Sequence, residues 1–114
     1  MEKEFVPYEL ALELKQLGMD LGWYNYLNFY DSSTKEFCFV MKDVPAPLYQ
    51  QAFRWFREKH NMNHSVILHE TTFSNDYQYL VLSNDNEFVE VGYITYEEAE
   101  LECLKKLIEI VKTK

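Results

Sequence analysis

Hydrophobic residues recur at intervals of three and four between residues 48 and 60. This spacing places them on one face of an α-helix, where they are expected to pack into a core. Trp55 falls at the boundary of that face, where a large ring is expected to be half buried. Pro45 and Pro47 favour an extended approach, with the helix starting directly afterwards. The expected core face carries Tyr49, Ala52, Phe53, Phe56 and His60.

The same periodicity predicts two further helices, one towards each end of the chain. The first covers residues 7–17 and ends at Gly18, a residue suited to a left-handed backbone. The last begins after Thr95, which together with Glu98 has the pattern of a capping box. Glutamates crowd its start and lysines its end, which matches the helix dipole. Its core stripe consists of Leu101, Leu104, Leu107, Ile108 and Val111.

Runs rich in aromatic and β-branched residues predict five strands, at residues 23–30, 36–42, 64–72, 76–83 and 87–95. The first two read as a hairpin, and Tyr24, Tyr26 and Tyr30 share one face of its first strand. The predicted order is α-β-β-α-β-β-β-α. We therefore expect an α+β fold, in which an antiparallel sheet of about five strands carries three helices largely on one face. A chain of 114 residues makes one globular domain, residues 1–114.

Composition narrows the classes of function. Nineteen acidic against 11 basic residues give a net charge of −8, which disfavours direct nucleic-acid binding. The sequence contains no apolar run of the roughly 20 residues that span a bilayer, so no membrane association is expected. Cys38 and Cys103 have no metal-binding or redox spacing and read as buried thiols. These features predict a cytoplasmic protein.

Catalytic motifs are lacking. With only three glycines the chain contains neither a phosphate-binding loop nor a dinucleotide fingerprint. His60, His64 and His69 have no ligand-like spacing with carboxylates or cysteines, which disfavours a metal site. We expect a protein that is not an enzyme, with no catalytic residues, no metal and no cofactor.

The arginines offer one candidate site. Arg54 and Arg57 are the only two in the chain and lie three residues apart on a helix face, where two guanidinium groups can grip a phosphate or carboxylate. Trp55, Tyr24 and Tyr26 are candidates to stack on a base beside them. The alternative is a solvated helix face with ion pairs to nearby glutamates. The tyrosine face also reads as an ordinary half-exposed sheet face or as a dimer seam.

Three segments carry a resemblance to a known group of proteins. They are EFVPYELALELKQLGMD, QAFRWFREKH and TYEEAELECLKKLIEIVK, of which FRWFREK and YEEAELxCLKKLIEIV are the specific part. They resemble a family of small uncharacterised proteins encoded by phages and prophages of Bacteroidota-type bacteria. Together they cover somewhat under half of the chain. The family has no known activity or catalytic residues to transfer, and the resemblance implies the cytosol of a bacterial host.

The resemblance implies function by binding, and two hypotheses follow. In the first, a phage accessory protein acts in counter-defence by sequestering a small, anionic, nucleotide-derived host signal through Arg54, Arg57, Trp55, Tyr24 and Tyr26. In the alternative, a protein-interaction module inhibits or scaffolds a host or phage protein. A homo-oligomer is compatible with both, because a small domain can build a pocket at a subunit interface.

Overall fold

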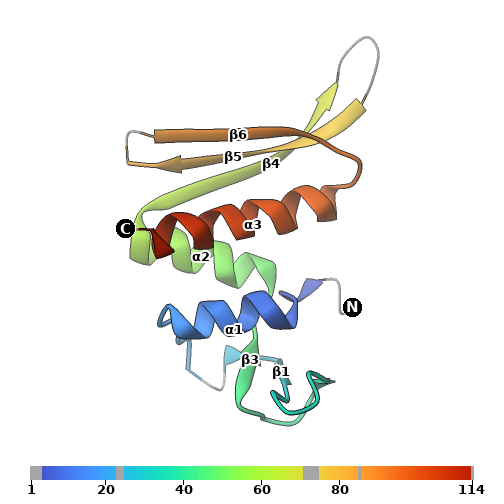
Figure 1. The fold of residues 1–114 in the computed structure, drawn as a ribbon, viewed down its shortest axis with the longest axis vertical. Helices are drawn as coiled ribbons and strands as arrows, with labels where there is room; N and C mark the ends of the chain where they lie inside the picture. The colour runs from blue at the N-terminus through green and yellow to red at the C-terminus, as the bar shows by residue number, and fades with distance from the viewer. Residues whose placement is uncertain (1–3, 23–24, 71–74, 85, 114) are drawn as a thin grey trace. The chain divides into compact units, whose positions relative to one another are not determined.

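The computed structural model describes residues 4–22, 25–70, 75–84 and 86–113 (Figure 1). The chain divides into two compact units, Met1–Ala52 and Phe53–Lys114. Within the described ranges each unit contains one three-stranded antiparallel sheet. The α+β class predicted from the sequence is thus confirmed. The prediction of one sheet of about five strands differs from the structure, whose described residues form six strands in two sheets.

The first unit packs helix α1 (Tyr8–Gln16) against strand β3 (Val44–Ala46). The helix ends as expected: Gly18 has a φ of 97°, and its N–H donates to the carbonyl of Lys15. The N–H of Met19 donates to the carbonyl of Leu14, which completes a Schellman cap. A short sequence signal therefore sets where this helix stops.

The sheet of the first unit has the order β2-β1-β3, with β1 at Asn28–Tyr30 and β2 at Phe37–Cys38. The strand β3 contains Pro45, which lies opposite Phe29. Proline has no N–H to donate, so it is tolerated here because β3 is an edge strand. The two prolines predicted only an extended approach to the next helix, so this strand was not predicted.

Helix α2 (Tyr49–His60) begins in the first unit and continues into the second. The side chain of Gln51 accepts the N–H of Leu48 at 2.8 Å and donates to the carbonyl of Asn25 at 2.9 Å. The helix ends before Asn61, whose φ of 53° is left-handed. The predicted helix is confirmed, and four of its five expected core residues are buried: Tyr49, Ala52, Phe53 and Phe56.

The second unit is built on three antiparallel strands in the order β4-β5-β6, at Met62–Glu70, Asn75–Ser83 and Asn86–Tyr93. Strand β6 has one extra residue opposite Gln78 of β5, because Tyr77 pairs with Tyr93 while Tyr79 pairs with Glu90. Gly92 lies in this bulge with a φ of 97°, a conformation that glycine adopts without steric cost. The bulge lets Tyr93 share one face of the sheet with Tyr77 and Tyr79, and the rings of Tyr79 and Tyr93 stack there.

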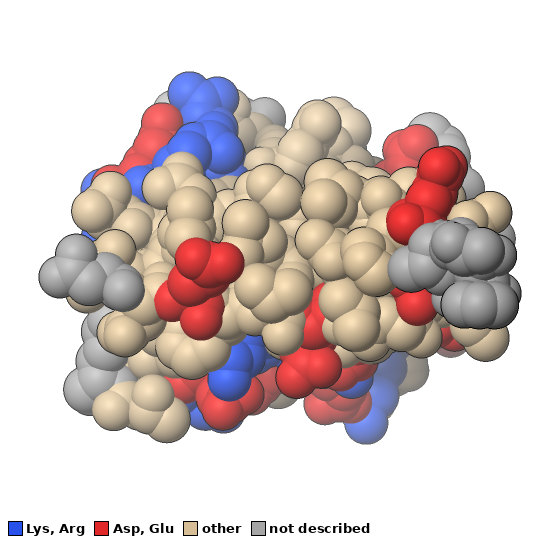
Figure 2. Space-filling view, turned by 90° about the horizontal axis from the view of Figure 1, so that it is seen from above, with Lys and Arg blue, Asp and Glu red and all other residues tan. Residues whose placement is uncertain are grey.

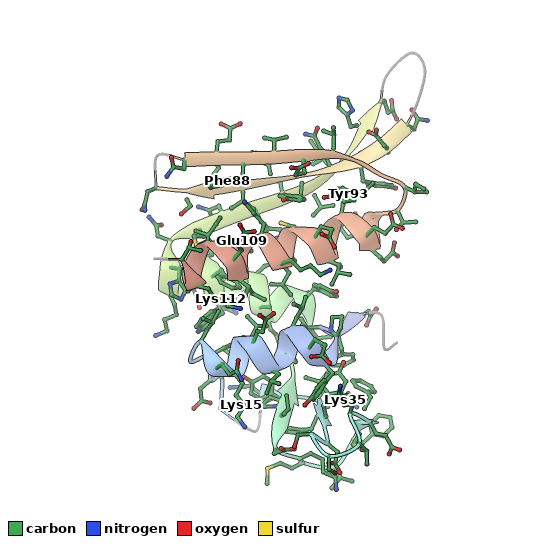
Figure 3. All side chains as sticks on the ribbon, viewed as in Figure 1. Lys15, Lys35, Phe88, Tyr93, Glu109 and Lys112 are labelled. Atoms are coloured by element: carbon green, nitrogen blue, oxygen red, sulfur yellow. The ribbon has the colours of Figure 1, made fainter. Side chains whose placement is uncertain are left out.

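Helix α3 (Tyr96–Lys112) lies against one face of this sheet and contacts all three strands (Figure 1). We call this the inner face and the opposite side the outer face. Figure 3 shows Phe88 and Tyr93 on the side of β6 that faces α3. The amine of Lys106 lies 4.8 Å from the centre of the Phe88 ring. The buried residues of α3 are Ala99, Cys103, Leu104, Leu107 and Ile108.

The start of α3 is capped as expected. The hydroxyl of Thr95 accepts the N–H of Glu98 at 3.1 Å, and the carboxylate of Glu98 accepts the N–H of Ile94 at 3.3 Å. Replacing Thr95 with alanine should lower the free energy of unfolding by about 1 kcal/mol, because a helix N–H loses its acceptor. Urea denaturation followed by circular dichroism measures this loss. Thr95→Ser keeps the hydroxyl, and an equal loss in that variant would contradict the capping role.

Candidate functional site

The two arginines of α2 are exposed, but one has a partner. The Nε of Arg54 lies 3.2 Å from a carboxylate oxygen of Glu58, one helical turn away. This is the solvated ion pair that the sequence analysis kept as the alternative. Trp55 is only 6% exposed, so the prediction of a half-buried boundary ring is wrong. Its ring packs edge-on against Phe56 and His60, which leaves little of it to stack on a ligand.

Of the two tyrosines predicted to join the arginines, Tyr26 is described by the structure and is buried. Tyr26 is 7% exposed and its hydroxyl accepts the N–H of Leu21, while burial raises its pKa. The strand β1 spans only Asn28–Tyr30, so Tyr26 lies before it and not on the predicted strand face. Tyr30 is also buried, and its hydroxyl donates to the carbonyl of Val6 at 2.7 Å. Tyr24 lies outside the described residues.

A small pocket beside Tyr26 is too small for a nucleotide. It encloses about 10 Å³, which is room for about one water molecule. Its lining is Ala11, Leu14, Lys15, Met19, Tyr26, Pro45 and Pro47. Five residues were predicted to bind a ligand. Of these, Arg54 and Arg57 are exposed, Trp55 and Tyr26 are buried, and Tyr24 lies outside the described residues.

The histidines have separate structural roles. The ring of His64 stacks on Phe53 with centroids 3.7 Å apart, and burial lowers its pKa to about 4 with a further contribution from Arg57. The Nδ1 of His69 lies 3.2 Å from a carboxylate oxygen of Asp76 on the neighbouring strand. Over the ranges that the structure describes, no three His, Cys, Asp or Glu side chains are grouped to hold a metal ion.

The inner face of the second unit holds a cluster of groups that keep their protons. Burial raises the pKa of the Cys103 thiol to about 12, and burial also raises the pKa of Tyr79. The rings of Tyr79 and Tyr93 stack with centroids 6.0 Å apart. Cys103 is the buried thiol that the sequence predicts, whereas Cys38 is half-buried. At neutral pH this cluster presents no thiolate and serves as packing.

Among the described residues, the outer face of the same sheet carries several large apolar side chains that remain exposed. Alternate residues along the three strands point away from α3, and the register places Leu80 beside Val89 and Ser65. Exposed fractions of the large apolar side chains on this face are Ile67 49%, Leu82 43%, Val89 48% and Val91 51%. Contiguous apolar surface on a rigid sheet is a typical site of protein contact.

Charge is distributed unevenly around this face. Residues 61–95 contain no lysine or arginine, and their acidic residues are Glu70, Asp76, Asp85, Glu87 and Glu90. On the outer face Glu87 lies beside Leu82 at one end, and Asp76 lies beside His69 at the other. Figure 2 looks onto this face: uncharged side chains cover most of it, one acidic side chain stands within it, and both acidic and basic side chains appear at the edge of the view.

The first unit also exposes apolar side chains, at residues 39–41. Phe39 is 83% exposed, Val40 68% and Met41 61%. Hydrogen bonds hold the loop directly after these residues, since the Asp43 carboxylate accepts the N–H and the hydroxyl of Ser32. These three residues form a short loop tip, whereas the outer face spans three strands.

The exposed outer face was not predicted, although the sequence of two of its strands carries a signal for it. Strands β4 and β5 have apolar residues on both faces, as in the run from Val66 to Leu68 and the run from Leu80 to Leu82. Such runs indicate a strand covered on both sides, and here α3 covers only one. Comparison of the chain with protein-family models, curated proteins and solved structures finds no match. The resemblance to phage proteins thus stays a prediction, as do the expected absences of catalysis, cofactor and nucleic-acid binding.

Proposed function

We propose that the protein is a non-enzymatic protein-interaction module that binds a partner through the outer face of the β4-β5-β6 sheet. The observation that carries the proposal is the uncovered row of apolar side chains on a sheet whose other face is packed by α3. In a chain with 26% charged residues, a face covered mostly by uncharged side chains is best explained by contact with another protein.

The second hypothesis, sequestration of a nucleotide-derived signal, keeps Arg54 and Arg57 as its anchor. These arginines supply positive charge at the surface, but Trp55 and Tyr26, two of the three aromatic residues expected to stack on a base, are buried. We therefore rank it below the interaction module. A melting temperature raised by one class of nucleotide, and unchanged by that nucleotide in the Arg54→Ala/Arg57→Ala variant, would reverse this order.

Capture from a bacterial lysate tests the interaction module. The lysate is prepared from a Bacteroidota-type bacterium, the kind of host that the sequence resemblance implies. Bait with the native sequence should retain a stoichiometric partner, and bait carrying Leu82→Asp and Val89→Asp should lose it, because two buried charges cost several kcal/mol at an apolar contact. Bands quantified after tandem purification give the measurement.

The matched control is Phe39→Asp, which places a charge on the exposed loop of the other unit. It should retain the partner. Loss of the partner with Phe39→Asp alone would move the interaction surface to residues 39–41. Equal capture by all three baits would contradict a role for either surface.

A further inference from the structure

We infer that the outer face binds a basic amphipathic helix of a partner protein, about as long as α3. This inference rests on the proposed function and adds the chemistry of the partner. It combines the dimensions of the sheet, the arrangement of its apolar residues and the sign of the charge around them.

The inner face shows what covers a surface of this size. One helix of 17 residues, α3, contacts all three strands there. Such a helix is about 26 Å long at 1.5 Å per residue, and strands of nine residues extend over about 30 Å. The two faces of a sheet share one outline, so a single helix of similar length also covers the outer face.

The apolar side chains form a track suited to a helix. Leu80 and Leu82 lie on the central strand. Val89 lies beside Leu80 on one edge strand, and Ile67 lies beside Gln78 on the other. The apolar stripe of an amphipathic helix, with residues three and four apart, packs onto such a track. The polar side of the bound helix then faces solvent and the acidic ends of the face.

Charge selects the kind of helix and disfavours a second copy. Asp76 and Glu87 stand at opposite ends of the outer face, and no lysine or arginine occurs anywhere in residues 61–95. Two copies joined through this face would put Asp76 and Glu87 of both copies into one interface, in a chain of net charge −8. A helix with lysine or arginine flanking its apolar stripe meets the opposite charge at both ends.

Two synthetic peptides of 18 residues test the inference. Both carry the same leucine stripe and a fluorescent label, and their polar positions are all lysine in one and all glutamate in the other. Fluorescence anisotropy with the full chain should give at least about tenfold tighter binding of the lysine peptide, weakened by added salt. Sedimentation equilibrium of the protein alone should give the mass of one chain.

The variant Leu82→Asp/Val89→Asp separates docking from unspecific attraction. It makes the protein more acidic, so charge attraction alone would strengthen binding of the lysine peptide, whereas docking on the face predicts at least about a tenfold loss. Phe39→Asp adds acidic charge in the other unit and should retain binding. Leu82→Thr/Val89→Thr keeps strand-forming residues and should also bind more weakly, which guards against misfolding of the aspartate variant.

Three results would overturn the inference. Equal binding of the two peptides would remove the preference for a basic helix. Binding of neither peptide, while the lysate partner is still lost with Leu82→Asp/Val89→Asp, would mean that the outer face binds something other than a basic helix. A native mass of two chains that falls to one in that variant would assign the face to a second copy. Equal capture of the lysate partner by native and variant bait, in contrast, contradicts the proposed function itself.

Discussion

Replacing Leu104 with alanine is expected to lower the free energy of unfolding of the second unit by about 3 kcal/mol. Leu104 is 0% exposed, on the helix that packs the inner face of the sheet. Its truncation removes apolar contact and leaves a cavity, because close-packed surroundings relax only in part. Urea denaturation followed by far-ultraviolet circular dichroism measures the change.

The outer face supplies the matched control for this prediction. Val89→Ala removes a side chain that is 48% exposed and should cost less than about 1 kcal/mol. Leu104→Ala and Val89→Ala together compare the two faces of one sheet. A loss for Val89→Ala as large as that for Leu104→Ala, growing with protein concentration, would mean that the isolated protein already covers its outer face. That outcome would also contradict an outer face left free for a partner.

Acidification from pH 6.5 to pH 4 is expected to destabilise the second unit through His64. Burial lowers the pKa of this ring from 6.5 to about 4, so the folded state favours the neutral form. The contribution of His64 is fully present above pH 6.5 and is lost as the pH falls towards 4. The full loss for that pKa change would be about 3 kcal/mol, and partial exposure of the ring reduces it to about 2 kcal/mol.

The variant His64→Phe isolates this effect. It keeps an aromatic ring to stack on Phe53 and removes the proton. The difference in unfolding free energy between native protein and variant, measured at intervals from pH 7 to pH 4, should show the loss in the native protein alone. His69→Gln is the control and should keep the His64 contribution. A similar fall in His64→Phe would assign the acid sensitivity to another group, and an NMR titration of the His64 ring reports the pKa directly.

Much of the local structure followed from the sequence because it depends on neighbouring residues. Gly18 ends α1 and Thr95 begins α3 as expected, since caps require only a suitable backbone or hydroxyl within one turn. The core face of α2 was also predictable, because helical periodicity alone determines which side chains share a face. The strand β3 was missed because its proline suggested an irregular segment and its edge position is a property of the sheet.

The candidate site was less predictable. The arginine pair was predicted as the site because it holds the only two guanidinium groups of an acidic chain. In the structure Arg54 pairs with Glu58, and the Trp55 ring is buried. Periodicity places Trp55 at a helix boundary, but the packing of its ring against Phe56 and His60 depends on how the chain surrounds it. The apolar outer face left no single motif, because its residues come from three separate strands.

The sequence by itself determined the three helices, the order of most strands, the acidic charge and the absence of positive charge from residues 61–95. These are properties of composition and of contacts within a few residues. Only the tertiary structure decided that the strands form two sheets and that α3 covers one face of the second while the other stays open. Runs such as the one from Leu80 to Leu82 supply apolar side chains to both faces. Whether a face is buried depends on where a distant helix packs, which alternation along a strand does not encode.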